Sequence, residues 1–249
     1  MPSLFGVQSY CFRNTNDNAQ TAELVKSCGL DTIEVCRVHV DFEDQSAHAP
    51  AIEAYRNAGV ELVSIGVNPI DTDEAKARCL FEFARKAGLR LMSIDFPIEA
   101  VPECFALADR LAEEYDIRLG VHNHGGRHWL GSAQALQWVF RHTSSRIGVS
   151  LDTAWALDSR EDPVEMVDRF ADRVYIVHLK DFLFDEARNP RDVIVGTGNL
   201  DLPALDKALA DTGFTGPAIL EYEGDVEDPV PSLRECAEAV RTSMPRTIS

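Results

Sequence analysis

The stretch Val174-Tyr-Ile-Val-His-Leu-Lys-Asp181 places a metal-binding side chain, His178, directly after a short apolar run. The second half of the chain repeats this pattern in Ile117–His122, Ile147–Asp152 and Pro217–Glu221. The four candidate ligands, His122, Asp152, His178 and Glu221, are separated by 30, 26 and 43 residues. These intervals are close to the length of a strand followed by a helix, so a repeating parallel fold would bring the four side chains to one rim.

Length and composition favour one (β/α)8 TIM barrel domain that covers residues 1–249. The chain has 249 residues, 45% of them hydrophobic, and such barrels have roughly 250 residues. Its formal charge of −17 would repel phosphodiester backbones and anionic lipids. We therefore expect neither nucleic-acid nor membrane binding, and small neutral or metal-bridged substrates fit better.

Cysteine usage and the absence of targeting signals predict a cytoplasmic protein. The six cysteines are scattered and include no Cys-x-x-Cys pair, which favours reduced thiols. The first residues lack the pattern of a signal peptide, and no run of about 18 apolar residues occurs.

Strand-like and helix-like segments alternate along the whole chain. The eight predicted strands are Leu4–Ser9, Thr32–Cys36, Glu61–Val67, Leu91–Phe96, Ile117–His122, Ile147–Asp152, Val174–His178 and Pro217–Glu221. The eight predicted helices are Ala19–Ser27, Ala49–Ala58, Asp73–Ala87, Val101–Tyr115, Ser132–His142, Pro163–Phe170, Leu202–Asp211 and Ser232–Thr242. Gly29, Gly59 and Gly88 follow the first three helices, as C-terminal caps do.

The alternation of strands and helices favours a closed barrel over a doubly wound sheet. The long connection Asp181–Asp201 is predicted to be a loop at the catalytic mouth.

Alternation within the strands predicts which side chains face this mouth. His178 and Lys180 share a face of their strand, as do Glu221 and Glu223, and as do His122 and His124. A lone histidine in an apolar run is often a satisfied core residue. Ionised Asp and Glu are rarely buried unless they are paired or bind a metal, which favours a metal site at these strand ends.

Several motifs carry a resemblance to a known family. They are Gly6-Val-Gln-Ser-Tyr, Gly29-Leu-Asp-Thr-Ile-Glu34, Val149-Ser-Leu-Asp-Thr, Val177-His-Leu-Lys-Asp181, Gly196-Thr-Gly-Asn-Leu-Asp201 and Leu220-Glu-Tyr-Glu-Gly. In their order and spacing the chain resembles the xylose isomerase-like barrel superfamily, in particular its sugar phosphate isomerase/epimerase branch. The resemblance implies a divalent metal at the mouth, with Asp152, His178 and Glu221 at three ligand positions.

The fourth ligand position departs from the family pattern. Many members have Glu-Asn-His at the end of strand five, whereas this chain has His122-Asn-His124. The exchange lowers the ligand charge from about −3 to about −2 and softens the site, so we expect Mn²⁺ first, with Zn²⁺, Co²⁺, Fe²⁺ or Mg²⁺ as alternatives. It also removes one of the two opposed glutamates that some members use to epimerise.

The resemblance implies a metal-dependent isomerase or epimerase of a ketose or sugar phosphate, which abstracts a proton beside a carbonyl through an enediolate. Glu221 or His124 is the predicted base, and Lys180 is predicted to hold a substrate oxygen, or else to pair with Asp181 or Glu223. The alternative activity is that of a lyase on an oxidised sugar such as a 3-oxo-glycoside, similar to the C-glycoside-cleaving enzymes. We expect a homo-oligomer, with a small partner subunit if the lyase alternative holds.

Further residues are candidates for substrate binding. They are Glu34, His39, Trp129, Trp155 and Glu223, with Asp95 as a supporting residue behind them. The alternative role of Glu34 is a structural ion pair, for example with Arg37. The alternative role of the two tryptophans is packing. A third hypothesis is an endonuclease IV-like enzyme or a non-catalytic binding module. The acidic charge argues against DNA binding, and a site for three metals would need more histidines at strand ends than the chain offers.

Overall fold

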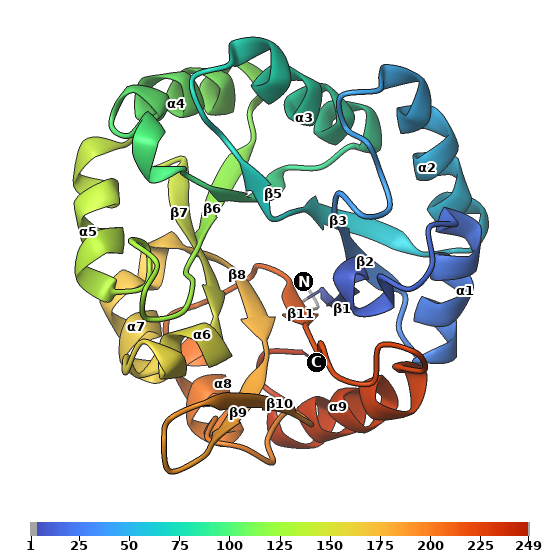
Figure 1. Ribbon diagram of the computed structural model, residues 1–249, viewed down its shortest axis with the longest axis vertical. Coiled ribbons are helices and arrows are strands. Elements are labelled where there is room, and N and C mark those ends of the chain that lie inside the picture. Colours follow the sequence, from blue (N-terminus) through green and yellow to red (C-terminus); the bar gives the residue numbers. More distant parts are fainter. Residues whose placement is uncertain (1–3, 249) are drawn as a thin grey trace.

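Nine parallel strands form a nearly closed barrel, and the helices between them surround it (Figure 1). The computed structural model describes residues 4–248. The strands, in their order around the barrel, are β3 (Glu61–Ile65), β2 (Thr32–Val35), β1 (Phe5–Gln8), β11 (Ala218–Leu220), β8 (Val174–Leu179), β7 (Ile147–Asp152), β6 (Arg118–His122), β5 (Leu91–Asp95) and β4 (Asn68–Pro69). The predicted (β/α)8 TIM barrel is confirmed. The predicted strand Glu61–Val67 ends at Ile65, where β3 stops, and an additional short strand, β4, follows it. β3 pairs with β2, whereas β4 pairs with β5.

The helices lie on the outside of the barrel, and all except α6 lie at the places that the sequence predicts. They are α1 (Asn18–Ser27), α2 (Gln45–Asn57), α3 (Glu74–Ala87), α4 (Glu103–Tyr115), α5 (Ala133–His142), α6 (Thr153–Asp158), α7 (Pro163–Phe170), α8 (Leu202–Asp211) and α9 (Val230–Ser243). Side-chain caps explain several starts: α2 begins four residues earlier than predicted because Asp44 accepts a hydrogen bond from Ser46 N–H. Gly29, Gly59 and Gly88 have φ of 74°, 68° and 78°, as the three predicted caps require.

Burial on both faces explains the near-continuous apolar strands. Every residue of β7 and of β8 is buried, because the barrel interior covers one face and the helices cover the other. The strands also approach one another closely. A Cβ on Gly6 in β1 would lie 2.4 Å from the carbonyl oxygen of Thr32 in β2, so only glycine fits there.

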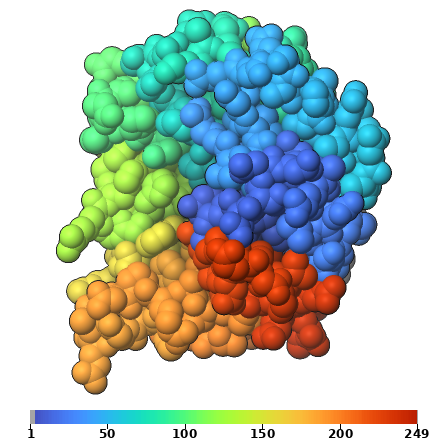
Figure 2. Space-filling model, turned by 45° about the vertical axis from the view of Figure 1, so that its right-hand side comes forward, coloured from blue at the N-terminus to red at the C-terminus, as the bar shows by residue number. Residues whose placement is uncertain are grey.

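Two elements at the mouth were not predicted. The connection Asp181–Asp201 is not an irregular loop throughout: β9 (Asp181–Phe184) and β10 (Pro190–Val193) pair as an antiparallel hairpin. Phe182 and Val193 are buried, which ties the hairpin to the barrel. Figure 2 shows this part of the chain, in orange, projecting at the lower left. The short helix α6 follows β7 without a connecting residue, so the sequence offers no boundary between them.

Candidate metal centre and active site

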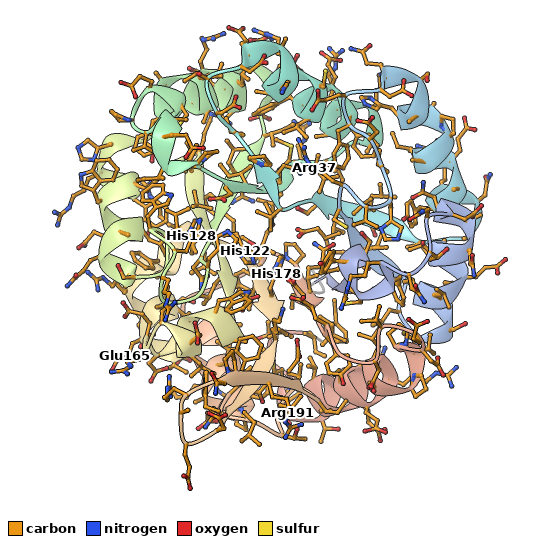
Figure 3. The ribbon with its side chains drawn as sticks, viewed as in Figure 1. Arg37, His122, His128, Glu165, His178 and Arg191 are labelled. Carbon is orange, nitrogen blue, oxygen red and sulfur yellow. The ribbon has the colours of Figure 1, made fainter. Side chains whose placement is uncertain are left out.

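The four predicted ligands meet at one end of the barrel. His122, Asp152 and His178 lie at the ends of β6 and β7 and near the end of β8, and Glu221 follows β11 directly. One ligand atom from each lies within 4.8 Å of the others, and all four side chains are buried. Figure 3 shows His122 and His178 near the centre of the barrel. Four segments separated in sequence thus supply one cluster, because parallel strands end at the same rim.

Four atoms of these ligands face one another, and the two from His122 and Asp152 have no hydrogen-bond partner among the described residues. The four atoms are His122 Nε2, Asp152 Oδ2, His178 Nδ1 and Glu221 Oε2. His178 Nδ1 and Glu221 Oε2 are 2.8 Å apart, and His122 Nε2 and Asp152 Oδ2 are 3.7 Å apart. Buried polar atoms are almost always paired. Two nitrogens and two carboxylate oxygens that converge in this way fit a divalent cation, which would replace the contact between His178 and Glu221.

Three of the four ligands have protonation states that suit a metal site. Burial, followed by the nearby His124 and His178, holds the pKa of His122 well below its usual value, so its imidazole is neutral and has a free lone pair. Burial raises the pKa of Asp152 to about 7. For Glu221 burial also acts upward, but Lys180 and His178 outweigh it and lower the pKa. A cation would favour both carboxylates in their ionised form. At His178 burial acts to lower the pKa, but Glu34 and Glu221 outweigh burial and raise the pKa well above its usual value, so this ring must release a proton when a cation binds.

Hydrogen bonds fix two ligands from behind. Asp152 Oδ1 accepts from Trp155 N–H at 2.8 Å, which leaves Oδ2 free for the cluster. The side chain of Asn123 accepts from Asp152 N–H at 2.8 Å and donates to the Asp152 carbonyl at 2.9 Å, which joins the ends of β6 and β7. His178 Nε2 lies 2.9 Å from Glu34 Oε1 and donates to it. Such outer contacts orient metal ligands.

A buried ammonium group lies beside the cluster. Lys180 is 1% exposed, forms an ion pair with Glu223, and has its Nζ 3.7 Å from Glu221 Oε1 and 3.8 Å from Asp192 Oδ2. Burial acts to lower its pKa, but Glu221, Asp152 and the other carboxylates outweigh burial and raise it. Lys180 therefore stays charged and suits the stabilisation of a negative oxygen better than proton release. The predicted alternative contact with Glu223 is present, whereas Asp181 accepts from the backbone N–H groups of Gly196, Gly198, Asn199 and Leu200.

The other predicted site residues lie at different distances from the cluster. His124 is near, since its ring centroid is 4.7 Å from that of His122. Trp155 is also near, with Lys180 Nζ 5.4 Å from the centre of its ring. The indole N–H of Trp129 donates to the Phe96 carbonyl at 2.8 Å, a structural contact.

Glu34 and His39 are both buried. The Glu34 oxygens accept from Gln8, Ser93 and His178, so this carboxylate faces the back of a ligand rather than open solvent, and Arg37 instead contacts Asn68. His39 lies beside Cys36, with its Nδ1 3.8 Å from the Cys36 Sγ.

Sequence reasoning missed two features of the mouth. The first is Asp192 on β10, whose pKa is raised to about 7 by burial despite the opposing charge of Lys180. The sequence does place Asp192 in the long polar connection Asp181–Asp201 predicted to lie at the mouth. That Asp192 faces Lys180, however, follows from the pairing register of the hairpin. The second is a pocket of about 260 Å³ beside Glu221, lined by residues that include Gln8, Tyr10, Arg37 and Val67. A small polar molecule in this pocket would contact the cluster through Glu221.

The comparisons with known proteins agree with this architecture. The sequence model of the xylose isomerase-like TIM barrel matches residues 22–243. The chain belongs to this family. Among the described residues of this family member, no helix is both long and apolar enough to cross a membrane.

Two curated relatives match about half of this family member. The rhizopine catabolism protein MocC of Rhizobium meliloti is 29% identical over 133 residues, which are 48% of this chain and 40% of the relative. An inosose dehydratase of Lacticaseibacillus casei is 25% identical over 133 residues, which are 48% of this chain and 44% of the relative. The matched stretch thus spans less than half the length of either relative.

Solved structures match nearly the whole barrel. A xylose isomerase domain protein of Alicyclobacillus acidocaldarius superposes with a TM-score of 0.78 at 15% identity and covers 98% of this chain and 100% of its own. A sugar phosphate isomerase/epimerase of Parabacteroides distasonis gives 0.77 at 16% identity, with 99% and 96% covered. At such identity these likenesses establish the fold.

Proposed function

We propose that this protein is a metal-dependent enzyme that removes a proton beside the carbonyl of a sugar or cyclitol ketone, and that elimination follows. The observation that carries the proposal is the cluster of four convergent ligand atoms next to the buried Lys180. A divalent ion held there polarises a carbonyl and stabilises negative charge on its oxygen. The ligand set of two histidines and two carboxylates fits Mn²⁺, Zn²⁺, Co²⁺ or Fe²⁺.

Residues around the cluster divide the chemical work. Lys180, which keeps its charge, holds the developing oxyanion or the leaving oxygen. Asp192 is the carboxylate whose pKa of about 7 suits proton abstraction at neutral pH. Glu221 has a lowered pKa and serves better as a ligand. His124 on the β5 and β6 side of the cluster is the alternative base, and the indole of Trp155 lies where it can contact a sugar ring.

Elimination is favoured over epimerisation by the residues beside the ligands. Epimerisation through a planar intermediate needs a proton-transfer group on each face, and His122 stands where the second glutamate of many family members lies. Loss of a β-oxygen needs one base, which takes the proton from carbon and returns it to the departing oxygen, and one cation that stabilises that oxygen as the C–O bond breaks. Asp192 and Lys180 supply these two groups. The inosose dehydratases among the relatives agree with water as a leaving group, and a 3-oxo-glycoside would lose its aglycone in the same way.

The test is product analysis in D₂O with the metal-loaded enzyme. A panel of ketoses, inososes and 3-oxo-glucosides is followed by NMR for deuterium at the carbon beside the carbonyl. Formation of an unsaturated ketone or release of an aglycone supports the proposal. Deuterated isomers or epimers without elimination would instead establish the second candidate, a sugar isomerase or epimerase, which the fold and the carboxylate-lined mouth also accommodate. Absence of exchange, elimination and isomerisation with every ketone would contradict both.

A further inference from the structure

A second group of metal-binding side chains lies outside the first cluster. It consists of Asp95 at the end of β5, His124 just beyond β6 and His128 in the loop that follows. One ligand atom from each lies within 4.8 Å of the others. Figure 3 shows His128 beside His122, on the same side of the barrel. The group is partly exposed, with side-chain exposures of 23% for Asp95, 29% for His124 and 36% for His128.

The two histidines of this group face one carboxylate oxygen without a hydrogen bond to it. His124 Nε2 is 3.6 Å from Asp95 Oδ2, and His128 Nε2 is 3.9 Å from the same oxygen. Both distances exceed those of an N–H···O hydrogen bond. His124 Nε2 and Asp95 Oδ1 are buried atoms without a hydrogen-bond partner among the described residues. Each imidazole turns its Nε2 toward the Asp95 carboxylate, and these separations leave room for one cation between the three side chains.

We propose that Asp95, His124 and His128 bind a second divalent transition-metal ion. Two imidazole nitrogens and one carboxylate oxygen form a set that suits Zn²⁺ or Fe²⁺ and leaves coordination positions open for substrate or water. The charge of −17 on the chain favours cation binding in general. The proposal concerns metal binding and does not rest on the reaction proposed above, although an ion bound here would exclude His124 as the alternative base.

The second ion would lie next to the first. The ring centroids of His122 and His124 are 4.7 Å apart, and each ring belongs to a different cluster. Ligation through His124 Nε2 would use the lone pair that a base needs, so His124 would then be a ligand. Metal binding would also break a hydrogen bond at His128, whose Nδ1 accepts from Leu130 N–H at 3.2 Å. Ligation through Nε2 moves the ring proton to Nδ1, so this long hydrogen bond must be given up.

Metal counting tests the proposal. Metal-free protein is dialysed against excess Zn²⁺, and separately against Co²⁺, and bound metal is measured by elemental analysis. We expect two equivalents for the wild type and one for His128→Gln and for Asp95→Asn. The matched control is His142→Gln, which changes an exposed histidine at the end of α5 and should retain two. Thermal unfolding followed by circular dichroism checks that each variant folds.

The Asp152→Asn variant reports on the first centre separately. It should lose one equivalent and keep the ion that depends on His128, and the double variant Asp152→Asn/His128→Gln should lose both. A wild-type protein that binds one ion, with no change in His128→Gln, would overturn the second site while leaving the first intact. Two ions that both survive in folded His128→Gln and Asp95→Asn would overturn it as well.

Discussion

His178 Nε2 lies 2.9 Å from Glu34 Oε1, and both side chains are fully buried. The same carboxylate accepts from Gln8 Nε2 at 2.7 Å and from Ser93 Oγ at 3.0 Å. Because Nε2 carries the proton that Glu34 accepts, the lone pair of a neutral His178 is on Nδ1, which faces Glu221. Glu34 thus selects the tautomer that can bind a metal.

Replacing this carboxylate should weaken metal binding without removing a ligand. We expect Glu34→Gln to lower the affinity of the first centre about 10- to 100-fold, as loss of such an outer contact typically does. Isothermal titration of metal-free protein measures the change. The control Glu43→Gln removes an exposed carboxylate and should bind like the wild type. Unchanged affinity in Glu34→Gln would show that Glu34 does not orient His178.

Proton abstraction by Asp192 predicts a pH dependence. A base acts in its deprotonated form, and burial raises the pKa of this carboxyl to about 7, so the rate of deuterium exchange should rise as the pH increases through about 7. Lys180, Glu221 and Glu223 are the charged groups that face it. Asp192→Asn should lose about 10²- to 10⁴-fold in rate and lose this rise. A full rate with the same profile in Asp192→Asn would exclude it as the base.

Removal of the Lys180 ammonium group should shift the pH at which the rate of deuterium exchange rises. Lys180 opposes the effect of burial on Asp192, so in Lys180→Met the rise in rate should shift to higher pH by roughly 1 unit or more. The residual exchange rate, followed across the pH range, gives the shift, and elemental analysis should find the first ion still bound. A profile that stays in place would mean that the two groups are not coupled.

The close approach of β1 and β2 predicts a stability effect. An added Cβ at Gly6 would lie 2.4 Å from Thr32 O, and backbone atoms cannot rotate away, so Gly6→Ala should lower the free energy of unfolding by about 1–3 kcal/mol. Urea unfolding measures it. Gly126→Ala is the matched control, since its Cβ would find no atom nearer than 3.4 Å. Equal stability of the two variants would contradict the packing argument.

The sequence predicts the barrel and the convergent ligands because both depend on periodicity. Apolar runs of strand length, each closed by a ligand such as Asp152 or Glu221, repeat at the spacing of strand-plus-helix units, and parallel strands then bring their ends together. Caps are equally local, so the positive φ at Gly88 follows from its place after a helix.

The remaining features depend on contacts that periodicity does not contain. The hairpin of β9 and β10 is set by its pairing register, which brings Asp192 to Lys180. Glu34 reaches His178 across the barrel, 144 residues along the chain. His128 lies in the loop after β6 and outside the strand pattern, so its approach to Asp95 depends on the path of that loop.

The most direct test of the central claim is the metal content of Asp152→Asn against that of the wild type. Both proteins are stripped of metal, dialysed against the same Mn²⁺ or Zn²⁺ solution and analysed for bound metal, with folding checked by circular dichroism. The four-ligand centre predicts that the folded variant binds one equivalent less than the wild type and loses exchange of the proton beside the carbonyl. Equal metal content and undiminished exchange in the variant would contradict a metal centre at His122, Asp152, His178 and Glu221.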